Sequence, residues 1–150
     1  MPLLPGFEIA ASGMSAQRLR LNLVSSNLAN AQTTRTEGGG PYRRQTPVFE
    51  AMIPEHLQGA NAPGRPAPSS EDATLRSVKV TRIREDTRPG MLVHDPDHPD
   101  ADVNGNVRMP NVNVIEEMVD MISASRSFEA NAQAFQTLRT MFDRSLDIGR

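Results

Sequence analysis

Hydrophobic residues repeat every seven positions near the start of the chain. The repeating positions are Phe7, Met14, Leu21 and Leu28. A companion series follows three residues later, at Ala10, Val24 and Ala31, and Gln17 is its one polar member. Because a seven-residue repeat keeps apolar side chains on one stripe of an α-helix, the pattern predicts a long amphipathic helix within residues 1–34. We call this stripe the amino-terminal seam.

A second seven-residue repeat lies near the other end of the chain. Its members are Met121, Phe128, Phe135 and Phe142. Asn113 is suited to cap the first free amides of this helix, with Glu116 three residues later. Gly149 marks a stop, so the pattern predicts a helix running toward Ile148. At 1.5 Å per residue, each of the two helices would be roughly 40–50 Å long.

The middle of the chain, residues 35–110, lacks the helical repeat. Residues 59–72 include a Pro/Gly/Ala/Ser run that cannot sustain a helix or a central strand, and they predict a flexible connector. Alternating valines at Val78 and Val80, and the apolar run 91–93, predict short strands. Asn104-Gly105 tolerates positive φ at both residues and predicts a hairpin.

These patterns together predict an α+β fold. The two long helices, from segments 1–34 and 111–150, would pair as an antiparallel coiled coil, and residues 35–110 would form a small β-rich module. Burying the apolar seams requires such pairing, because each phenylalanine removed from water contributes roughly 2–3 kcal/mol. Alanines on the other helix faces also permit contact with further helices, so the pattern leaves open whether the partner is internal or a second molecule.

Composition narrows the classes of function. The formal net charge is -2, with 16 Lys and Arg against 18 Asp and Glu, and the basic residues are scattered. We therefore expect no nucleic-acid partner. Cysteine is absent, which removes disulfides, thiolate metal sites and cysteine nucleophiles. No stretch approaches the ~18 apolar residues of a membrane span, and the first residues lack the pattern of a cleaved signal peptide.

The strongest enzymatic alternative is an acidic stretch that contains two histidines. Its candidate metal ligands are His94, Asp95, Asp97, His98, Asp100 and Asp102. Pro96 and Pro99 impose turns that direct these side chains apart, and the helical His-Glu-x-x-His spacing does not occur. No nucleophile elbow or phosphate-binding glycine loop is present in the sequence either. We therefore expect no catalytic residue, no metal and no cofactor.

Several short motifs resemble the flagellar axial proteins, the family of rod and hook subunits. SSNLANAQTT, at residues 25–34, resembles the asparagine-containing signature of the family. The motifs PYRRQ at 41–45, VHDPDHPDAD at 93–102 and MPNVNVIEEMVDMI at 109–122 resemble its proximal-rod members. Pro41-Tyr42 stands where distal rod and hook proteins have glycine-tyrosine, and Phe128 stands where the family commonly has tyrosine.

The resemblance implies a structural subunit of the bacterial flagellar basal body. Such a subunit is exported through the flagellar type III apparatus without a cleaved signal peptide, and its terminal segments are poorly ordered before assembly. Its terminal helices then assemble, with copies of itself and with other rod subunits, into a helical tube that crosses the periplasm and transmits motor torque. The remaining alternatives are another axial rod subunit and a soluble coiled-coil adaptor or export partner, with a metal-dependent enzyme last.

The expected functional residues are those of an assembly interface. They include the eight seam residues Phe7, Met14, Leu21, Leu28, Met121, Phe128, Phe135 and Phe142. Asn27 and Asn30 are expected at the helix end and in inter-subunit hydrogen bonds, because side-chain amides can satisfy carbonyls that an ending helix leaves free. Arg43 and Arg44 are expected to reach carboxylates or carbonyls of adjacent subunits, with a solvated surface as the alternative.

Overall fold

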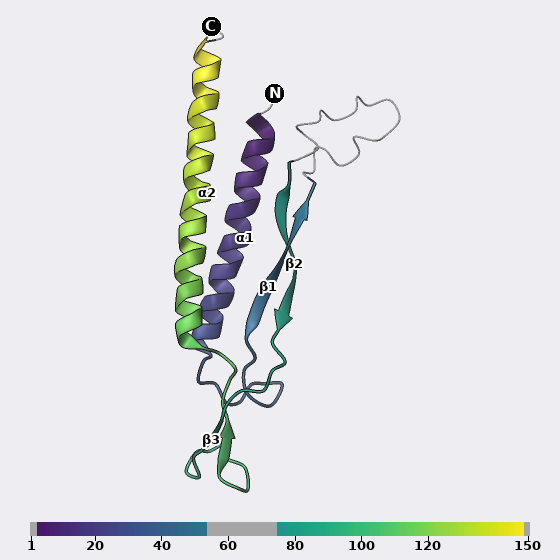
Figure 1. The fold of residues 1–150 in the computed structure, drawn as a ribbon, viewed down its shortest axis with the longest axis vertical. Coiled ribbons are helices and arrows are strands. Elements are labelled where there is room, and N and C mark those ends of the chain that lie inside the picture. Colours follow the sequence, from purple (N-terminus) through teal and green to yellow (C-terminus); the bar gives the residue numbers. More distant parts are fainter. Residues whose placement is uncertain (1–2, 54–74, 149–150) are drawn as a thin grey trace, which may run out of the picture. The chain divides into compact units, whose positions relative to one another are not determined.

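The computed structural model describes residues 3–53 and 75–148 and contains two helices and four strands. Helix α1 spans Leu3–Ala29 and helix α2 spans Val114–Ile148 (Figure 1). Between them, in chain order, lie β1 (Gln45–Met52), β2 (Ser77–Glu85), β3 (Leu92–His94) and β4 (Asn106–Arg108). The predicted α+β class is confirmed. The predicted connector at 59–72 lies outside the described residues.

Both helices end or begin as their sequences indicate. The side-chain amide of Asn30 donates to the carbonyl of Ser26 over 2.9 Å, which satisfies a carbonyl in the last turn of α1. At the start of α2, Asn113 Oδ1 accepts from the amide of Ile115 over 3.1 Å. Asn113 is therefore the amino-terminal cap that the sequence predicts.

The strands form two small two-stranded sheets, β1 with β2 and β3 with β4. β3 and β4 are antiparallel, and Val93 lies opposite Val107. The predicted hairpin is confirmed, although residues 95–105 connect its strands in place of a tight turn. Asp102 Oδ1 closes this loop by accepting from the amides of Asn104 and Asn106, and Gly105 adopts the left-handed φ of 74°. The sequence pattern does not predict β1, because Pro47 interrupts its alternation. Both strands of a two-stranded sheet are edge strands, and edge strands tolerate proline.

The described residues belong to two compact units, which we treat separately. Unit 1 comprises Met1–Arg18, Phe49–Thr81 and Ser125–Arg150. Within it, the ring of Phe7 meets those of Phe135 and Phe142 edge-on, with centroids 5.0 and 6.5 Å apart. A methyl group added to Gly13 would lie 2.9 Å from the Asn131 side chain, so glycine permits close approach of the helices there.

Unit 2 comprises Leu19–Val48 and Arg82–Ala124. Its buried hydrophobic residues are Leu23, Val24, Val107 and Ala124. Arg20 of α1 lies against Asp120 of α2, whereas Asn27, further along α1, lies against Glu117, earlier in α2. The helix segments within this unit therefore run antiparallel. Coiled-coil packing of the two helices stays a prediction.

Candidate functional site

A buried polar cluster occupies unit 2, where the end of α1 meets the segment before β1 and the first turns of α2. Its members are Arg20, Asn27, Tyr42, Arg44, Glu117 and Asp120. Glu117 is 0% exposed and Asn27 is 1% exposed. A buried carboxylate requires compensating partners, because transferring an unpaired charge out of water is strongly unfavourable. The contacts of the cluster show how Glu117 is compensated.

Glu117 is held by one arginine and one asparagine. Arg44 Nε donates to Oε1 of Glu117, and the side-chain amide of Asn27 donates to Oε2 over 2.9 Å. The guanidinium of Arg44 also reaches Asp120 over 3.2 Å, and Arg20 donates to the other oxygen of Asp120 over 2.8 Å. Two arginines thus face two carboxylates, so the cluster is formally neutral and both oxygens of Glu117 are satisfied.

The side chain of Asn27 makes four hydrogen bonds in this cluster. Besides its bond to Glu117, its amide donates to the carbonyl of Gln45 over 2.9 Å. Its side-chain oxygen accepts from the amide of Gln45 over 2.9 Å and from the hydroxyl of Tyr42 over 3.0 Å. One side chain therefore pairs with both backbone groups of a residue in β1, as a neighbouring strand would. Only a side-chain amide combines the two donors and the acceptor that this requires.

A second asparagine, Asn111, links the backbones of two segments. Asn111 Oδ1 accepts from the amide of Arg44 over 3.0 Å, and its side-chain amide donates to the carbonyl of Asp86 over 3.2 Å. The amide of Asp86 in turn donates to the carbonyl of Arg44 over 2.8 Å. The segment that carries Arg44 is therefore fixed on both sides before its side chain reaches Glu117.

Two members of this cluster, Asn27 and Arg44, are predicted from the sequence as interface residues, Asn27 also at the helix end. The structure shows both bonded within their own chain. The sequence pattern does not predict Glu117, the buried carboxylate of the cluster. The sequence does carry a signal for Glu117. It lies seven residues before Ala124, which is buried and follows Met121 of the repeat by three residues, so Glu117 lies on the same buried stripe of α2, where a charged residue needs a partner.

The predicted seam residues divide between the two units. In unit 1 the ring of Phe7 contacts those of Phe135 and Phe142, and the unit also holds Met14 and Phe128. Unit 2 holds Leu21, Leu28 and Met121. All eight side chains are partly buried. Asn30 bonds to the end of its own helix and Arg43 is exposed. Contacts of any of these residues with another subunit stay a prediction.

A row of exposed apolar residues lies on α2, on the side facing away from Glu117. It consists of Ile115, Met118, Val119 and Ile122, which we call the α2 stripe, and their exposed fractions are 72, 51, 61 and 56%. The spacing of three and four residues puts them on one helix face, about half a turn from Glu117. A helix that buries one face and leaves a second apolar face in water has a surface suited to another protein.

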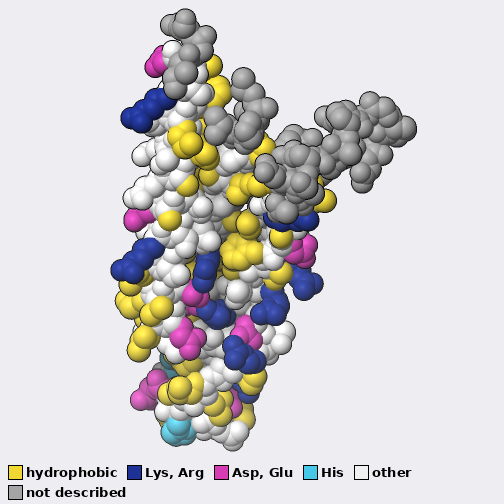
Figure 2. All heavy atoms as spheres, turned by 45° about the horizontal axis from the view of Figure 1, so that its top comes forward, with side chains coloured by type: hydrophobic (Ala, Val, Ile, Leu, Met, Phe, Trp, Pro, Cys, Tyr) yellow, Lys and Arg dark blue, Asp and Glu magenta, His cyan; other side chains and the backbone are white. Residues whose placement is uncertain are grey.

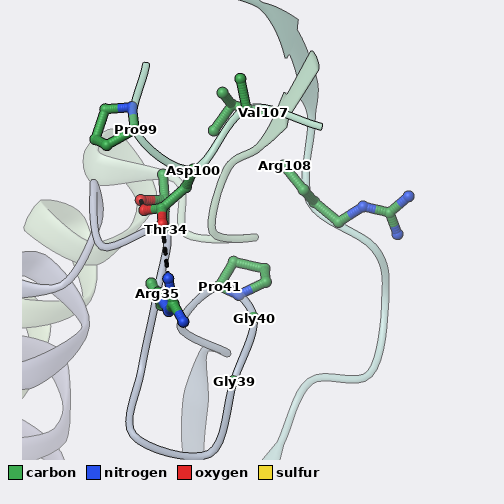
Figure 3. A pocket seen from close by; sticks show the side chains of 10 residues that line it. Thr34, Arg35, Gly39, Gly40, Pro41, Pro99, Asp100, Val107 and Arg108 are labelled. Atoms are coloured by element: carbon green, nitrogen blue, oxygen red, sulfur yellow. Dashed lines mark hydrogen bonds and ion pairs between the residues drawn. The ribbon is translucent and has the colours of Figure 1, made fainter. Parts of the chain in front are cut away.

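A hollow at the surface of unit 2 is lined by residues from segments 34–41 and 99–108. It has a volume of about 480 Å³, and its lining includes Arg35, Pro41 and Asp100 (Figure 3). Asp100 accepts from the hydroxyl of Thr34 over 2.7 Å and pairs with Arg35 at 3.7 Å. Among the described residues, no group of three or more His, Asp or Glu side chains could hold a metal ion. His98 Nδ1 instead accepts from the amide of Asp100.

Comparisons with known proteins identify the family. The FlgC basal-body rod protein of Borreliella burgdorferi is 41% identical over 99% of this chain and 98% of its own length. The FlgC protein of Aquifex aeolicus is 43% identical over 98% of this chain and 97% of its own length. The FlgC protein of Salmonella typhimurium is 40% identical over the whole of both chains. The chain belongs to the FlgC family of flagellar basal-body rod proteins.

Two family models match the ends of the chain and agree with this assignment. Residues 7–35 match the model described as flagella basal body rod protein, and residues 103–148 match the carboxy-terminal model of the flagellar rod proteins FlgE, FlgF and FlgG. The predicted family is confirmed, and so is a structural role in the basal body in place of an enzymatic one. No helix in the described part of the chain is long and apolar enough to cross a membrane.

Proposed function

We propose that this protein is a subunit of the proximal rod, which assembles through its terminal helices into a helical tube that transmits motor torque. The observation that carries the proposal is the similarity to FlgC proteins along the entire chain, combined with an α2 helix that is apolar on two faces. On one face of α2, the seam residues and Glu117 make contacts within the chain. The other face, the α2 stripe, is left for neighbouring subunits.

The seam residues act first within the subunit in this proposal. The edge-on contact of Phe7 with Phe135 and Phe142 supports pairing of the terminal segments 1–34 and 111–150 as an antiparallel coiled coil. Residues 35–110 form the β-rich module beside them. The exposed guanidinium of Arg43 is available for a carboxylate or carbonyl of an adjacent subunit. Contacts between subunits in a rod join different surfaces, with a rotation that does not close into a ring, so that the assembly grows as a filament.

Location and partners follow from this role. We place the protein in the part of the rod that crosses the periplasm, delivered by the flagellar type III export apparatus without a cleaved signal peptide. Its partners would be copies of itself and other rod subunits. No cofactor, nucleic acid or membrane span is part of the proposal.

A complementation experiment tests the proposed function. The chain, carrying a short internal epitope, replaces FlgC in a motile bacterium, and both swimming and the presence of the epitope in purified basal bodies are measured. Phe135→Asp places a charge against Phe7 and is expected to abolish swimming and incorporation, whereas Phe135→Leu keeps an apolar side chain and retains both. Swimming by the Phe135→Asp strain would overturn the assignment of the seam.

The same experiment separates a rod subunit from an adaptor. A rod subunit remains in basal bodies after detergent extraction. A soluble export partner would restore swimming yet be absent from those particles, and that result would contradict the proposed function.

A further inference from the structure

The loop of the β3–β4 hairpin contains a chemically reactive pair of residues. Asn104 is the one asparagine of the sequence that is followed by glycine. The backbone nitrogen of the next residue can attack the side-chain amide of an asparagine, and glycine hinders this attack least, because it has no side chain. Asn104 is exposed, and its side chain has no hydrogen-bond partner among the described residues. Sequence and exposure alone would therefore make Asn104 prone to deamidation.

Water reaches this loop. Figure 2 shows histidine atoms, in cyan, at the surface, and the two described histidines, His94 and His98, both belong to the hairpin or its loop. Val103, which precedes Asn104, is fully exposed. Burial therefore does not protect Asn104, and the water that deamidation consumes is present at the site.

The hydrogen bonds of the folded loop oppose the reaction. The nitrogen that would attack, the backbone nitrogen of Gly105, donates to the carbonyl of Asp102 over 2.9 Å. The carboxylate of Asp102 holds the loop closed by accepting from the amides of Asn104 and Asn106 over 2.8 and 2.9 Å. The amide of Asp102 in turn donates to the carbonyl of Asn106 over 2.9 Å. The nitrogen of Gly105 must therefore break its own hydrogen bond before it can reach the side chain of Asn104.

We propose that Asn104 is a deamidation site of the unfolded chain and that Asp102 protects this site once the hairpin has folded. In the reaction, the nitrogen of Gly105 forms a bond to Cγ of Asn104, and the bond from Cγ to the side-chain nitrogen breaks. That nitrogen leaves as ammonia with the proton of the Gly105 amide, and a succinimide ring remains. Water then opens the ring on either side and gives aspartate or isoaspartate. This inference does not depend on the proposed rod function.

Isoaspartate changes the hairpin more than aspartate does. It directs the backbone through the former side chain and so adds a methylene group between residues 104 and 105. The carboxylate of Asp102 accepts from the amides of residues 104 and 106, which lie on either side of this addition. The two amides would then no longer be spaced to reach one oxygen. A chain that is modified before it folds is therefore expected to close this loop poorly.

Mass spectrometry of the full chain tests the proposal. The purified chain is incubated at one mildly alkaline pH, either folded or unfolded in guanidinium chloride. Conversion is followed as the mass change from an amide to an acid, and peptide mapping assigns it to residue 104. The unfolded chain should convert at least about tenfold faster, the factor that corresponds to the loss of one amide hydrogen bond. Asn104→Gln is the control and should not convert, because its longer side chain would have to close a larger and less favourable ring.

Two substitutions test the part that Asp102 plays. Asp102→Asn keeps an oxygen acceptor and should keep most of the protection. Asp102→Ala removes the acceptor and should raise the rate in the folded chain toward that of the unfolded chain, with circular dichroism confirming that the helices remain.

Three results would overturn the proposal. Equal rates in the folded and unfolded wild-type chain would mean that the loop gives no protection, and absence of conversion in the unfolded chain would mean that Asn104 is not a modification site. A folded Asp102→Ala chain that converts as slowly as the wild type would exclude Asp102 as the protecting residue. If Asp102→Ala does not fold, the comparison of the folded and unfolded wild-type chain still decides whether folding protects Asn104.

Discussion

Asn27 shows how much of this fold depends on the chemistry of one side chain. Its amide donates to Glu117 and to Gln45, and its oxygen accepts from Gln45 and Tyr42. No other kind of side chain of this size supplies two donors beside an acceptor with two lone pairs. A near-isosteric exchange therefore tests the chemistry of the cluster without changing its volume.

Asn27→Asp should destabilise unit 2 by about 3 kcal/mol or more, because it removes both donors and places a second carboxylate beside Glu117. Tyr42 is the one tyrosine of a chain without tryptophan, so its fluorescence during urea unfolding reports on this cluster. Asn22→Asp, at an exposed position of the same helix, is the control. Equal unfolding midpoints for the two variants would contradict the assigned role of Asn27.

The carboxyl group of Asp86 accepts several hydrogen bonds from Arg88. Hydrogen bonds from the side chain of Arg88, over 3.1 and 2.9 Å from Nε, and from its backbone amide lower the pKa of Asp86 from 3.8 to about 2. A carboxyl whose pKa is lower in the folded state stabilises that state at pH values above 3.8. This contribution is lost as the pH falls from about 4 to about 2.

The Asp86 titration can be followed by NMR of its side-chain carboxyl carbon. In Arg88→Gln, which loses the charged donor, the midpoint should rise from about 2 toward 3.8. Arg82→Gln leaves the contacts of Asp86 intact and should not move the midpoint. An unchanged midpoint in Arg88→Gln would show that another group lowers the pKa of Asp86.

At the scale of the elements, α1 carries a polar residue on its apolar seam. The side-chain oxygen of Gln17 is buried and has no hydrogen-bond partner among the described residues. An unsatisfied buried acceptor costs about 1–3 kcal/mol. Such an acceptor in one helix weakens the packing of that helix against its neighbour. It also disfavours other registers of the two helices that would bury Gln17 against another apolar face.

Gln17→Leu should therefore raise the melting temperature of the isolated chain, corresponding to about 1–2 kcal/mol, as followed by the helical signal in circular dichroism. Gln136→Leu, an equal change at an exposed position of α2, should leave it nearly unchanged. A lower melting temperature for Gln17→Leu would indicate that the amide makes a bond to water that leucine cannot replace. Swimming of the same strain would show whether the polar residue is needed for assembly.

At the scale of the whole molecule, the chain buries little hydrophobic surface. Six described hydrophobic residues are buried, four of them in unit 2, and two of the six are alanines of unit 1. Large apolar side chains on α2 remain in water. A monomer with so small a core has little free energy to oppose the entropy of its long helices, and we therefore predict that subunit contacts supply part of its stability.

Amide hydrogen exchange, followed by backbone NMR, should show that the two units of the isolated chain differ in stability. We expect slow exchange around residues 20–30 and 114–124, where the polar cluster joins both helices, and faster exchange at 5–18 and 125–147. Assembly should slow exchange in both units. Uniformly slow exchange in a stable monomer would mean that the helices are satisfied within one chain, as an adaptor requires.

The sequence by itself determined the two helices, their capped or glycine-marked ends, the β3–β4 hairpin and the family. These features depend on local periodicity, on turn residues and on motifs of contiguous residues, all of which a sequence displays directly. It also indicated the seam, because a seven-residue repeat defines a helix face without reference to a partner.

Only the tertiary structure decided which groups meet. Arg44 and Glu117 are separated by 73 positions and Asn27 and Glu117 by 90, and no periodic pattern encodes such a pairing. Once Glu117 faces α1, the helix geometry directs Ile115 and Met118 outward, so the same contact that satisfies the buried carboxylate also sets which apolar face is open to a neighbour. The physical reason is that burying a charge requires a partner from elsewhere in the chain, whereas burying an apolar side chain does not specify one.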